Sequence, residues 1–308
     1  MDVRIRNVAA NLSRWGCEIR ETPRGVAWNT WGDGQSEVSI QALNVTTLDG
    51  DEIVAEARFT HTFGPKIQES LSPERAAFWN IMASLSAMVS ASEEDGFRLI
   101  ARAPLYKGDD DAWERIYAPF LCTEAYQQPM AILEAVNGAT SDPGRFGLEN
   151  VQDHPPFSEA SFLEAREYCL ERAFDATASA TGLSVEFPWH SAKDAGPDKL
   201  TFLCRLSIQE RHPCLGRGLL ASLQVPATFA DQQAVVSAVT ELNRWESEAT
   251  DMVPLFGAWC MDPRTRNPMF TMFLPNELCV IRPTTVLAWM MHRARRVSSL
   301  LAQLSESN

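Results

Sequence analysis

Apolar residues at the start of the chain recur with the period of a helix. Four of them lie three or four positions apart: Ile5, Val8, Leu12 and Trp15. That spacing places them on one helical face. Gly16 follows, and glycine is common just beyond the end of a helix. The pattern therefore predicts a first helix that ends at Gly16.

Alternating and β-rich runs come next and predict strands at 25–31, 37–45 and 52–61. Ser72 and Pro73 then form a helix start, with Ser72 as N-cap and Pro73 at the first helical position. The apolar face expected for this second helix consists of Phe78, Ile81, Leu85 and Met88.

A hairpin is expected after this helix, with its turn at residues 93–96. A third helix follows, because Asp111 and Glu114 have the spacing of a capping box. Residues 138–157 then change character, since Gly and Pro gather there. Such a stretch is typical of a linker.

The same order begins again after the linker. Ser161 and Glu164 predict a helix start, and Gly182 predicts its end. Asp231 is expected to cap a further helix with an apolar face. The strands expected in this half lie at 183–189, 200–209 and 219–225, and a hairpin at 255–275 precedes a long helix at 284–304.

Both halves therefore have the predicted order α-βββ-α-ββ-α, and the chain divides into a domain at 1–137, a linker at 138–157 and a domain at 158–308. We expect an α+β fold in which each half is an antiparallel sheet packed against helices. Asn80 and Asn243 occupy matching places in the second helix of each half. Each is expected to hydrogen-bond backbone where its helix meets the next strand, although an exposed asparagine is the simpler alternative.

This repeated order resembles the type III secretion chaperone-like fold, including the bacterial YbjN-like families that share it. The stretch "LNRWESEATDMVPLFGAW", an Asn inside the second helix followed by an apolar strand, is similar to part of that pattern. The resemblance occurs once per half. It implies a covalent pseudo-dimer that binds protein segments. Dedicated secretion chaperones are shorter, single-domain proteins, so the chain departs from them in length.

Composition narrows the range of partners. Hydrophobic residues make up 45% of the 308 residues and charged residues 22%, as in ordinary globular proteins. The formal net charge of −13 argues against nucleic acid, whose binding requires clustered Lys and Arg. The seven Cys are odd in number and contain no C-x-x-C pair, which favours reduced, buried thiols in a cytoplasmic protein. Neither a signal peptide nor a membrane span is expected.

The search for catalytic or metal-binding residues yields one weak constellation. His212 and Cys214 share a strand face, and His190 and Cys204 are expected nearby in the sheet. Four such side chains are ligand types for zinc, but strand-end histidines and buried thiols are the interpretation that we prefer. No G-x-S-x-G or H-E-x-x-H motif is present. We therefore predict no catalytic residues, no metal site and no cofactor.

Four residues are candidates for partner binding. Trp28 and Trp31 are expected on opposite faces of one strand, so one of them can anchor a protein contact or fill the seam between the halves. Arg293 and Arg296 offer a basic face for an acidic peptide. The alternative for these arginines is a favourable position in the C-terminal half of a helix.

Two classes of function compete. The leading hypothesis is a non-enzymatic, protein-binding or chaperone-like protein of the cytoplasm, with a protein or peptide partner and with self-association left open. The alternative is an enzyme or a small-ligand sensor whose site lies between the two halves. A bound ligand or metal in a closed cleft favours the alternative, whereas an exposed apolar surface favours the leading hypothesis.

Overall fold

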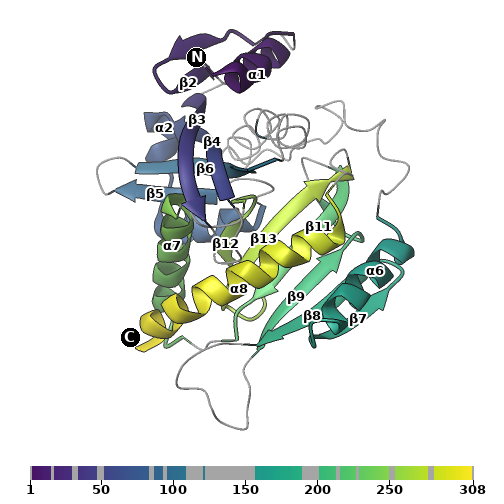
Figure 1. The fold of residues 1–308 in the computed structure, drawn as a ribbon. Helices are drawn as coiled ribbons and strands as arrows, with labels where there is room; N and C mark the ends of the chain where they lie inside the picture. Colours follow the sequence, from purple (N-terminus) through teal and green to yellow (C-terminus); the bar gives the residue numbers. More distant parts are fainter. Residues whose placement is uncertain are drawn as a thin grey trace.

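The computed structural model describes residues 2–14, 17–29, 34–46, 52–82, 87–92, 96–108, 121, 157–188, 201–212, 216–226, 229–249, 254–276 and 281–306. Within these ranges the fold is built from two antiparallel β-sheets and the helices that pack on them (Figure 1). Every strand pair described is antiparallel, so the predicted α+β class is confirmed.

The first sheet contains the strands β1 Arg20–Thr22, β2 Gly25–Asn29, β3 Gly34–Thr46, β4 Glu52–Phe63, β5 Ala87–Ser92 and β6 Gly96–Tyr106. Its spatial order is β1-β2-β3-β4-β6-β5. Helix α1 (Val3–Arg14) packs against β2. Between β4 and β5 the chain forms α2 (Pro65–Gln68), α3 (Pro73–Trp79) and the short 3-10 helix η1 (Asn80–Met82).

The second sheet contains the strands β7 Asp175–Ser179, β8 Gly182–Pro188, β9 Thr201–Ser207, β11 Gly216–Gln224, β12 Ala258–Met261 and β13 Pro268–Pro275. Its order is β12-β13-β11-β9-β8-β7, and β10 (Arg211–His212) pairs with β11. Helix α6 (Glu159–Leu170) packs on β7 and β8, α8 (Pro283–Glu306) packs on β9 and β11, and α7 (Gln232–Glu248) packs on β12.

The two sheets have the same strand order. Read from one edge, β1-β2-β3-β4-β6-β5 corresponds strand by strand to β7-β8-β9-β11-β13-β12. In each sheet the second strand of the first hairpin, β2 or β8, begins at a glycine that pairs with the end of the strand before it, Gly25 with Thr22 and Gly182 with Ser179. In each sheet four strands of this common order therefore precede the central helix, where the sequence pattern predicts three.

The additional strand of the second half is β7, which the sequence pattern missed because of the way in which α6 ends. The predicted helix continues to Gly182, but α6 ends at Leu170 because the chain reverses at Ala173, whose φ is 60°. The N–H of Phe174 bonds to the carbonyl of Cys169, and the N–H of Ala173 bonds to that of Leu170, as in a Schellman motif. Glycine usually occupies the left-handed position, so an alanine there gives no stop signal.

Of the N-caps predicted for α3 and α6, the structure confirms the first and corrects the second. Ser72 caps α3 by accepting from the N–H of Arg75, as predicted. In α6 the N-cap is Ser158 rather than Ser161, and Ser161 instead lies at the third helical position. The hydroxyl of Ser161 accepts from the N–H of Ser158 at 2.7 Å, so the two serines form a reciprocal cap.

The second helix of the first half is much shorter than predicted. It ends at Trp79, and the chain enters β5 at Ala87. Phe78, assigned to the buried face, is 53% exposed, whereas Ala76 and Ala77 are buried. The pairing of β5 with β6 accounts for the difference, because Met88 lies opposite Leu99 in the sheet. The hairpin around residues 93–96 is confirmed, since Ser92 pairs with Gly96.

The two halves meet along a seam formed by their central helices. Helix α7 of the second half packs against β5 and β6 of the first, and α3 packs against β12 and against α7. One continuous cluster of buried apolar side chains includes residues from both sheets. Apart from Leu121, the helix expected after Asp111 lies outside the described residues, as does most of the expected linker.

Candidate functional site

Charged side chains meet at the seam, beneath the C-terminal end of α7. Arg102 on β6 donates to the carboxylate of Glu56 on β4 at 2.8 Å and to the carbonyls of Glu246 and Ala249. Arg58 donates to the carbonyl of Ser247 at 2.9 Å. Two arginines of the first half therefore cap the free carbonyls that end a helix of the second half, where positive charge also complements the helix dipole.

Glu246 continues this chain of contacts into the second half. Its carboxylate accepts from Arg293 Nε at 2.7 and 3.0 Å and from Trp259 Nε1 at 2.8 Å. Arg293 also donates to the carbonyl of Pro254 at 3.2 Å, and its guanidinium lies 3.8 Å from the centre of the Phe270 ring. We call Glu56, Arg102, Glu246 and Arg293 the seam network.

The seam network is buried, and its charged groups form hydrogen bonds and ion pairs with one another. Glu56, Arg102, Glu246 and Arg293 are all 4% exposed or less. Burial lowers the pKa of Arg102 from its ordinary value, and the adjacent Glu56 opposes that shift. Breaking a buried ion pair leaves an uncompensated charge, so each member depends strongly on its partner. The arrangement suits a structural bond between the halves better than it suits proton transfer to a substrate.

Backbone contacts reinforce the seam. The backbone N–H and carbonyl of Arg102 exchange hydrogen bonds with those of Leu255 at 3.3 and 3.0 Å. The hydroxyl of Thr271 on β13 donates to the carbonyl of Asn80 at 3.4 Å. A segment of the second half thus extends the first sheet, and a residue of the second sheet supports the end of α3.

Asn243 has the role expected from the sequence. Its side-chain amide donates to the carbonyl of Trp259, and its side-chain carbonyl accepts from the N–H of Trp259, both at 2.8 Å. Asn243 is 1% exposed, so the prediction of a structural contact is confirmed and the exposed alternative is wrong. Asn80 is likewise buried, at the C-cap of α3.

A serine and a histidine face each other inside the first sheet. Ser36 Oγ lies 2.9 Å from His61 Nδ1, and both side chains are buried. His61 Nε2 has no hydrogen-bond partner, and burial lowers the pKa of His61 to about 4. Neither side chain offers surface to a substrate, so the pair lacks the access that nucleophilic catalysis requires.

The thiols in the described ranges behave as core residues. Cys169, Cys204 and Cys260 are buried and unpaired, and Cys17 is half-buried. Burial raises the pKa of Cys169 to about 11 and that of Cys260 to about 12, which leaves little thiolate at neutral pH. No three His, Cys, Asp or Glu side chains gather as metal ligands within the described ranges. Of the imagined zinc ligands, His190 and Cys214 lie outside them.

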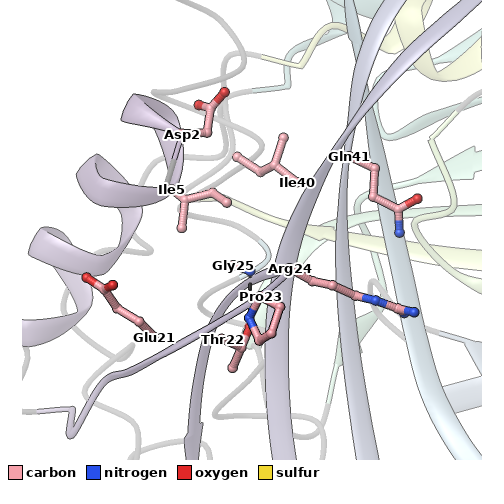
Figure 2. A pocket seen from close by; sticks show the side chains of 9 residues that line it. All are labelled: Asp2, Ile5, Glu21, Thr22, Pro23, Arg24, Gly25, Ile40 and Gln41. Carbon is pink, nitrogen blue, oxygen red and sulfur yellow. Dashed lines mark hydrogen bonds between the residues drawn. The ribbon is translucent and has the colours of Figure 1, made fainter.

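The largest cavity among those described lies between α1 and the first hairpin (Figure 2). Its volume is about 830 Å³, and it is lined by Asp2, Ile5, Glu21, Thr22, Pro23, Arg24, Gly25, Ile40 and Gln41. Asp2 and Thr22 already accept hydrogen bonds from backbone N–H groups of Arg4 and Gly25. In Figure 2, Arg24 and Gln41 lie on one side, away from Glu21. The polar groups therefore do not converge on one point.

Two smaller cavities lie in the second half. One is lined by residues of β8, α8 and the segment before β7, and the other lies over β7, β8 and β9. Each of the three cavities is thus lined by one half alone. At the seam, where an alternative site was expected, the described residues include the four buried side chains of the seam network.

Three of the four candidate partner-binding residues are described by the structure, and they lie in different surroundings. Trp28 is 1% exposed within the first sheet, and Arg293 is 0% exposed in the seam network. Neither presents surface to a partner in this conformation. Arg296 is half-buried, with its guanidinium 5.8 Å from the centre of the Trp245 ring. Trp31 lies outside the described residues.

The sequence contained signals for the seam network that the pattern analysis missed. Arg293 lies between Met290 and Val297 at helical spacing, on a face that is buried in α8. Glu246 follows Leu242 by four positions on the buried face of α7. A charged residue on each of two apolar helix faces is a signal for a buried ion pair. The contact of Arg102 with Glu56 depends on strand register, which no motif in the sequence marks.

Comparison with models of protein families, with curated proteins and with solved structures found no match to this chain. Among the helices in the described part of the chain, none combines the length and the apolar composition that crossing a membrane requires.

Proposed function

We propose that this chain is a non-enzymatic, protein-binding protein of the bacterial cytoplasm, made of two copies of a chaperone-like α+β fold joined as a pseudo-dimer. The observation that carries the proposal is the exposed aromatic ring of Phe78 on α3, beside the seam. Three further features support it, and each compares one half with the other.

Matching glycines support the two-copy arrangement. A Cβ added at Gly25 would lie 2.5 Å from the carbonyl oxygen of Val38, and one added at Gly182 would lie 2.4 Å from that of Leu206. The strand pairing makes these positions equivalent, because Gly25 pairs with Ser39 and Gly182 pairs with Ser207. Both hairpins therefore require glycine for the same close approach of a neighbouring strand.

The first helices of the two halves also correspond. Residues at the same spacing are buried in each: Ile5, Val8 and Leu12 in α1, and Phe162, Ala165 and Cys169 in α6. The two helices thus present the same face to their sheets.

The seam has the reciprocity of a two-fold arrangement. Each central helix packs on the edge strand of the other half, α7 on β5 and α3 on β12, and the two helices touch each other. An isologous interface has this property, because the same surface is used on both sides. The resemblance to dimeric chaperone-like proteins is consistent with such a seam enclosed in one chain.

Phe78 is not required by the fold, as a comparison with the other half indicates. Phe78 precedes Asn80 by two positions, and Glu241 precedes Asn243 by two positions. Glu241 is a solvated residue paired with Arg244 at 2.5 Å. A polar residue therefore suits this place in the fold, and an exposed phenylalanine is available to insert into an apolar pocket of a partner protein.

Capture from the native cell on the immobilised full-length chain tests the proposal. Phe78→Glu should reduce capture of the partner at least about tenfold, because it replaces an apolar anchor by a charge. Phe78→Leu should retain most of the binding. Ser237→Glu, which adds the same charge at an exposed position of α7, should leave capture unchanged.

The captured partner is identified by mass spectrometry and purified, and its binding to the wild-type chain and to the variants is then measured directly. Recovery of no protein above the level of the Phe78→Glu variant would overturn the proposal. Equal binding of the partner to the wild-type chain and to Phe78→Glu would exclude Phe78 as its anchor.

A further inference from the structure

The cavity between α1 and the first hairpin has an apolar centre. Ile5 of α1 and Ile40 of β3 face each other there (Figure 2). Ile5 is buried, and Ile40 is partly buried and packs against the core. The cavity volume of about 830 Å³ lies within the roughly 300–1,000 Å³ that is typical of ligand pockets.

Opposite charges flank this apolar centre. Figure 2 shows Glu21 on the side of α1, and Arg24 and Gln41 on the other side. Within the described part of the chain, the side chains of these three residues form no hydrogen bond or ion pair. The other polar side chains of the cavity, Asp2 and Thr22, already accept hydrogen bonds from backbone N–H groups. The cavity therefore offers a free carboxylate and a free guanidinium with apolar surface between them.

The hairpin turn fixes the place from which the guanidinium projects. Pro23 and Arg24 are the two residues of this turn, because Thr22 and Gly25 on either side of it pair with each other. Proline restricts φ, so the backbone of the turn is stiff. Arg24 thus extends from a rigid support beside the cavity.

The second half has a cavity at the corresponding hairpin, which allows a comparison that rests on the equivalence of the two halves proposed above. The strand pairing matches Ala178 to Glu21 and Thr181 to Arg24. Ala178 and Thr181 both line the second cavity, whose volume is about 380 Å³. The fold therefore forms a cavity at this hairpin without charges at these two positions, and the charges of the first cavity have a purpose other than stability.

The separation of the two charges indicates the chemistry of a ligand. A purely anionic ligand would be repelled by Glu21, and a purely cationic one by Arg24. A ligand with both charges satisfies both sides, and a guanidinium is the side chain best suited to a carboxylate, which it can bind through two hydrogen bonds. Three extended residues of a peptide place an amino group and a carboxylate about 10 Å apart.

We propose that this cavity binds a short zwitterionic peptide with an apolar side chain. The ammonium group of the peptide lies against Glu21, and its carboxylate lies against Arg24 and the amide of Gln41. Its apolar side chain packs on the two isoleucines, Ile5 and Ile40, and leaves water there.

Isothermal titration calorimetry of the full-length chain with the tripeptide Ala-Leu-Ala, at neutral pH and low salt, tests the proposal. A ligand of this size should bind with a Kd of about 0.1–1 mM. Acetylation of its amino group or amidation of its carboxyl group should each weaken binding about threefold, because each removes one charge that the cavity recognises.

Substitutions in the cavity assign each end of the peptide. Arg24→Gln should weaken binding of the free tripeptide about threefold and leave binding of the amidated one unchanged, since the charge that Arg24 recognises is then absent from the ligand. Glu21→Gln should show the same pattern with the acetylated tripeptide. Lys107→Gln, which removes a surface cation outside the cavity, should change nothing. Phe78→Glu should also have no effect, which separates this site from the surface proposed for a partner protein.

Absence of binding of Ala-Leu-Ala up to about 10 mM would overturn the proposal. Equal binding of the free and the capped tripeptides, or equal binding of the free tripeptide to the wild-type chain and to Arg24→Gln, would also overturn it. Glu21 and Arg24 are exposed, so the unfolding midpoints of both variants should match that of the wild-type chain. A loss of binding then reports on the cavity and not on the fold.

Discussion

At the residue scale, Asn243 joins a helix to a strand with one side chain. Its amide satisfies both backbone groups of Trp259, which are buried. Asn243→Ala removes both bonds at once and leaves a donor and an acceptor without partners. Each such group costs about 1–3 kcal/mol, so for the two groups we expect a loss of about 2–6 kcal/mol in the free energy of unfolding, measured with urea.

Ser237→Ala is the control for that measurement, because Ser237 is exposed on the same helix. It should change the free energy of unfolding by no more than about 0.5 kcal/mol. A loss smaller than about 1 kcal/mol for Asn243→Ala would contradict the structural role of the amide.

His61 makes stability depend on pH. Its pKa is about 4 in the folded protein and about 6.5 in the unfolded chain. As the pH falls below 6.5 the unfolded state takes up the proton first, so stability decreases until the pH reaches about 4. Between about pH 7 and about pH 5, protonation of His61 in the unfolded chain should lower the free energy of unfolding by about 2 kcal/mol.

Replacement of His61 by leucine provides the matched variant, because Leu223 pairs with Cys204 in the second sheet as His61 pairs with Ser36 in the first. Urea unfolding at both pH values should show a smaller decrease for His61→Leu than for the wild-type chain, by about that amount. Equal decreases in the two proteins would show that His61 does not titrate as the structure implies.

At the element scale, α7 ends against arginines that belong to the other half. Arg102→Met preserves length and removes the charge, which leaves two helix carbonyls without their donor and leaves Glu56 with only the longer contact to Arg58 at 3.4 Å. Loss of one partner of a buried ion pair costs about 3–5 kcal/mol, and we expect the free energy of unfolding to decrease by that amount.

Lys107 supplies the matched control, since it follows the last residue of β6 and pairs with Glu52, the first residue of β4, at the surface. Lys107→Met should cost at most about 1 kcal/mol, because exposed ion pairs contribute little. The free energy of unfolding of both variants is measured with urea. If both substitutions lowered it by the same small amount, the seam network would not contribute substantially to holding the halves together.

At the scale of the whole molecule, the continuous core predicts that the two halves open together. Cys260 lies on β12 at the seam and Cys204 on β9, and both are 0% exposed. Labelling with iodoacetamide, followed peptide by peptide with mass spectrometry, should give the same slow rate for both thiols and a faster one for the half-buried Cys17. In Arg102→Met, Cys260 should react before Cys204.

A wild-type chain in which Cys260 reacts at least about tenfold faster than Cys204 would contradict coupling of the halves, since the seam would then open by itself. The comparison needs no correction for thiolate content, because both thiols become solvent-exposed before they react.

The sequence by itself determined the features that depend on local pattern. The apolar face of α1 and the N-caps Ser72 and Asp231 were readable because periodicity and capping residues act within one element. Even Asn243 could be assigned its role, since a buried amide beside a turn to a strand requires backbone partners.

Tertiary structure decided what depends on pairing between distant segments. Met88 joined a strand rather than a helix because β6 was available to pair with it, and Ser36 met His61 through a register that alternation alone does not specify. Arg293 lies in the core because Glu246 on another helix compensates its charge there. Local composition favours solvent for an arginine, and only a partner brought by the fold can outweigh that preference.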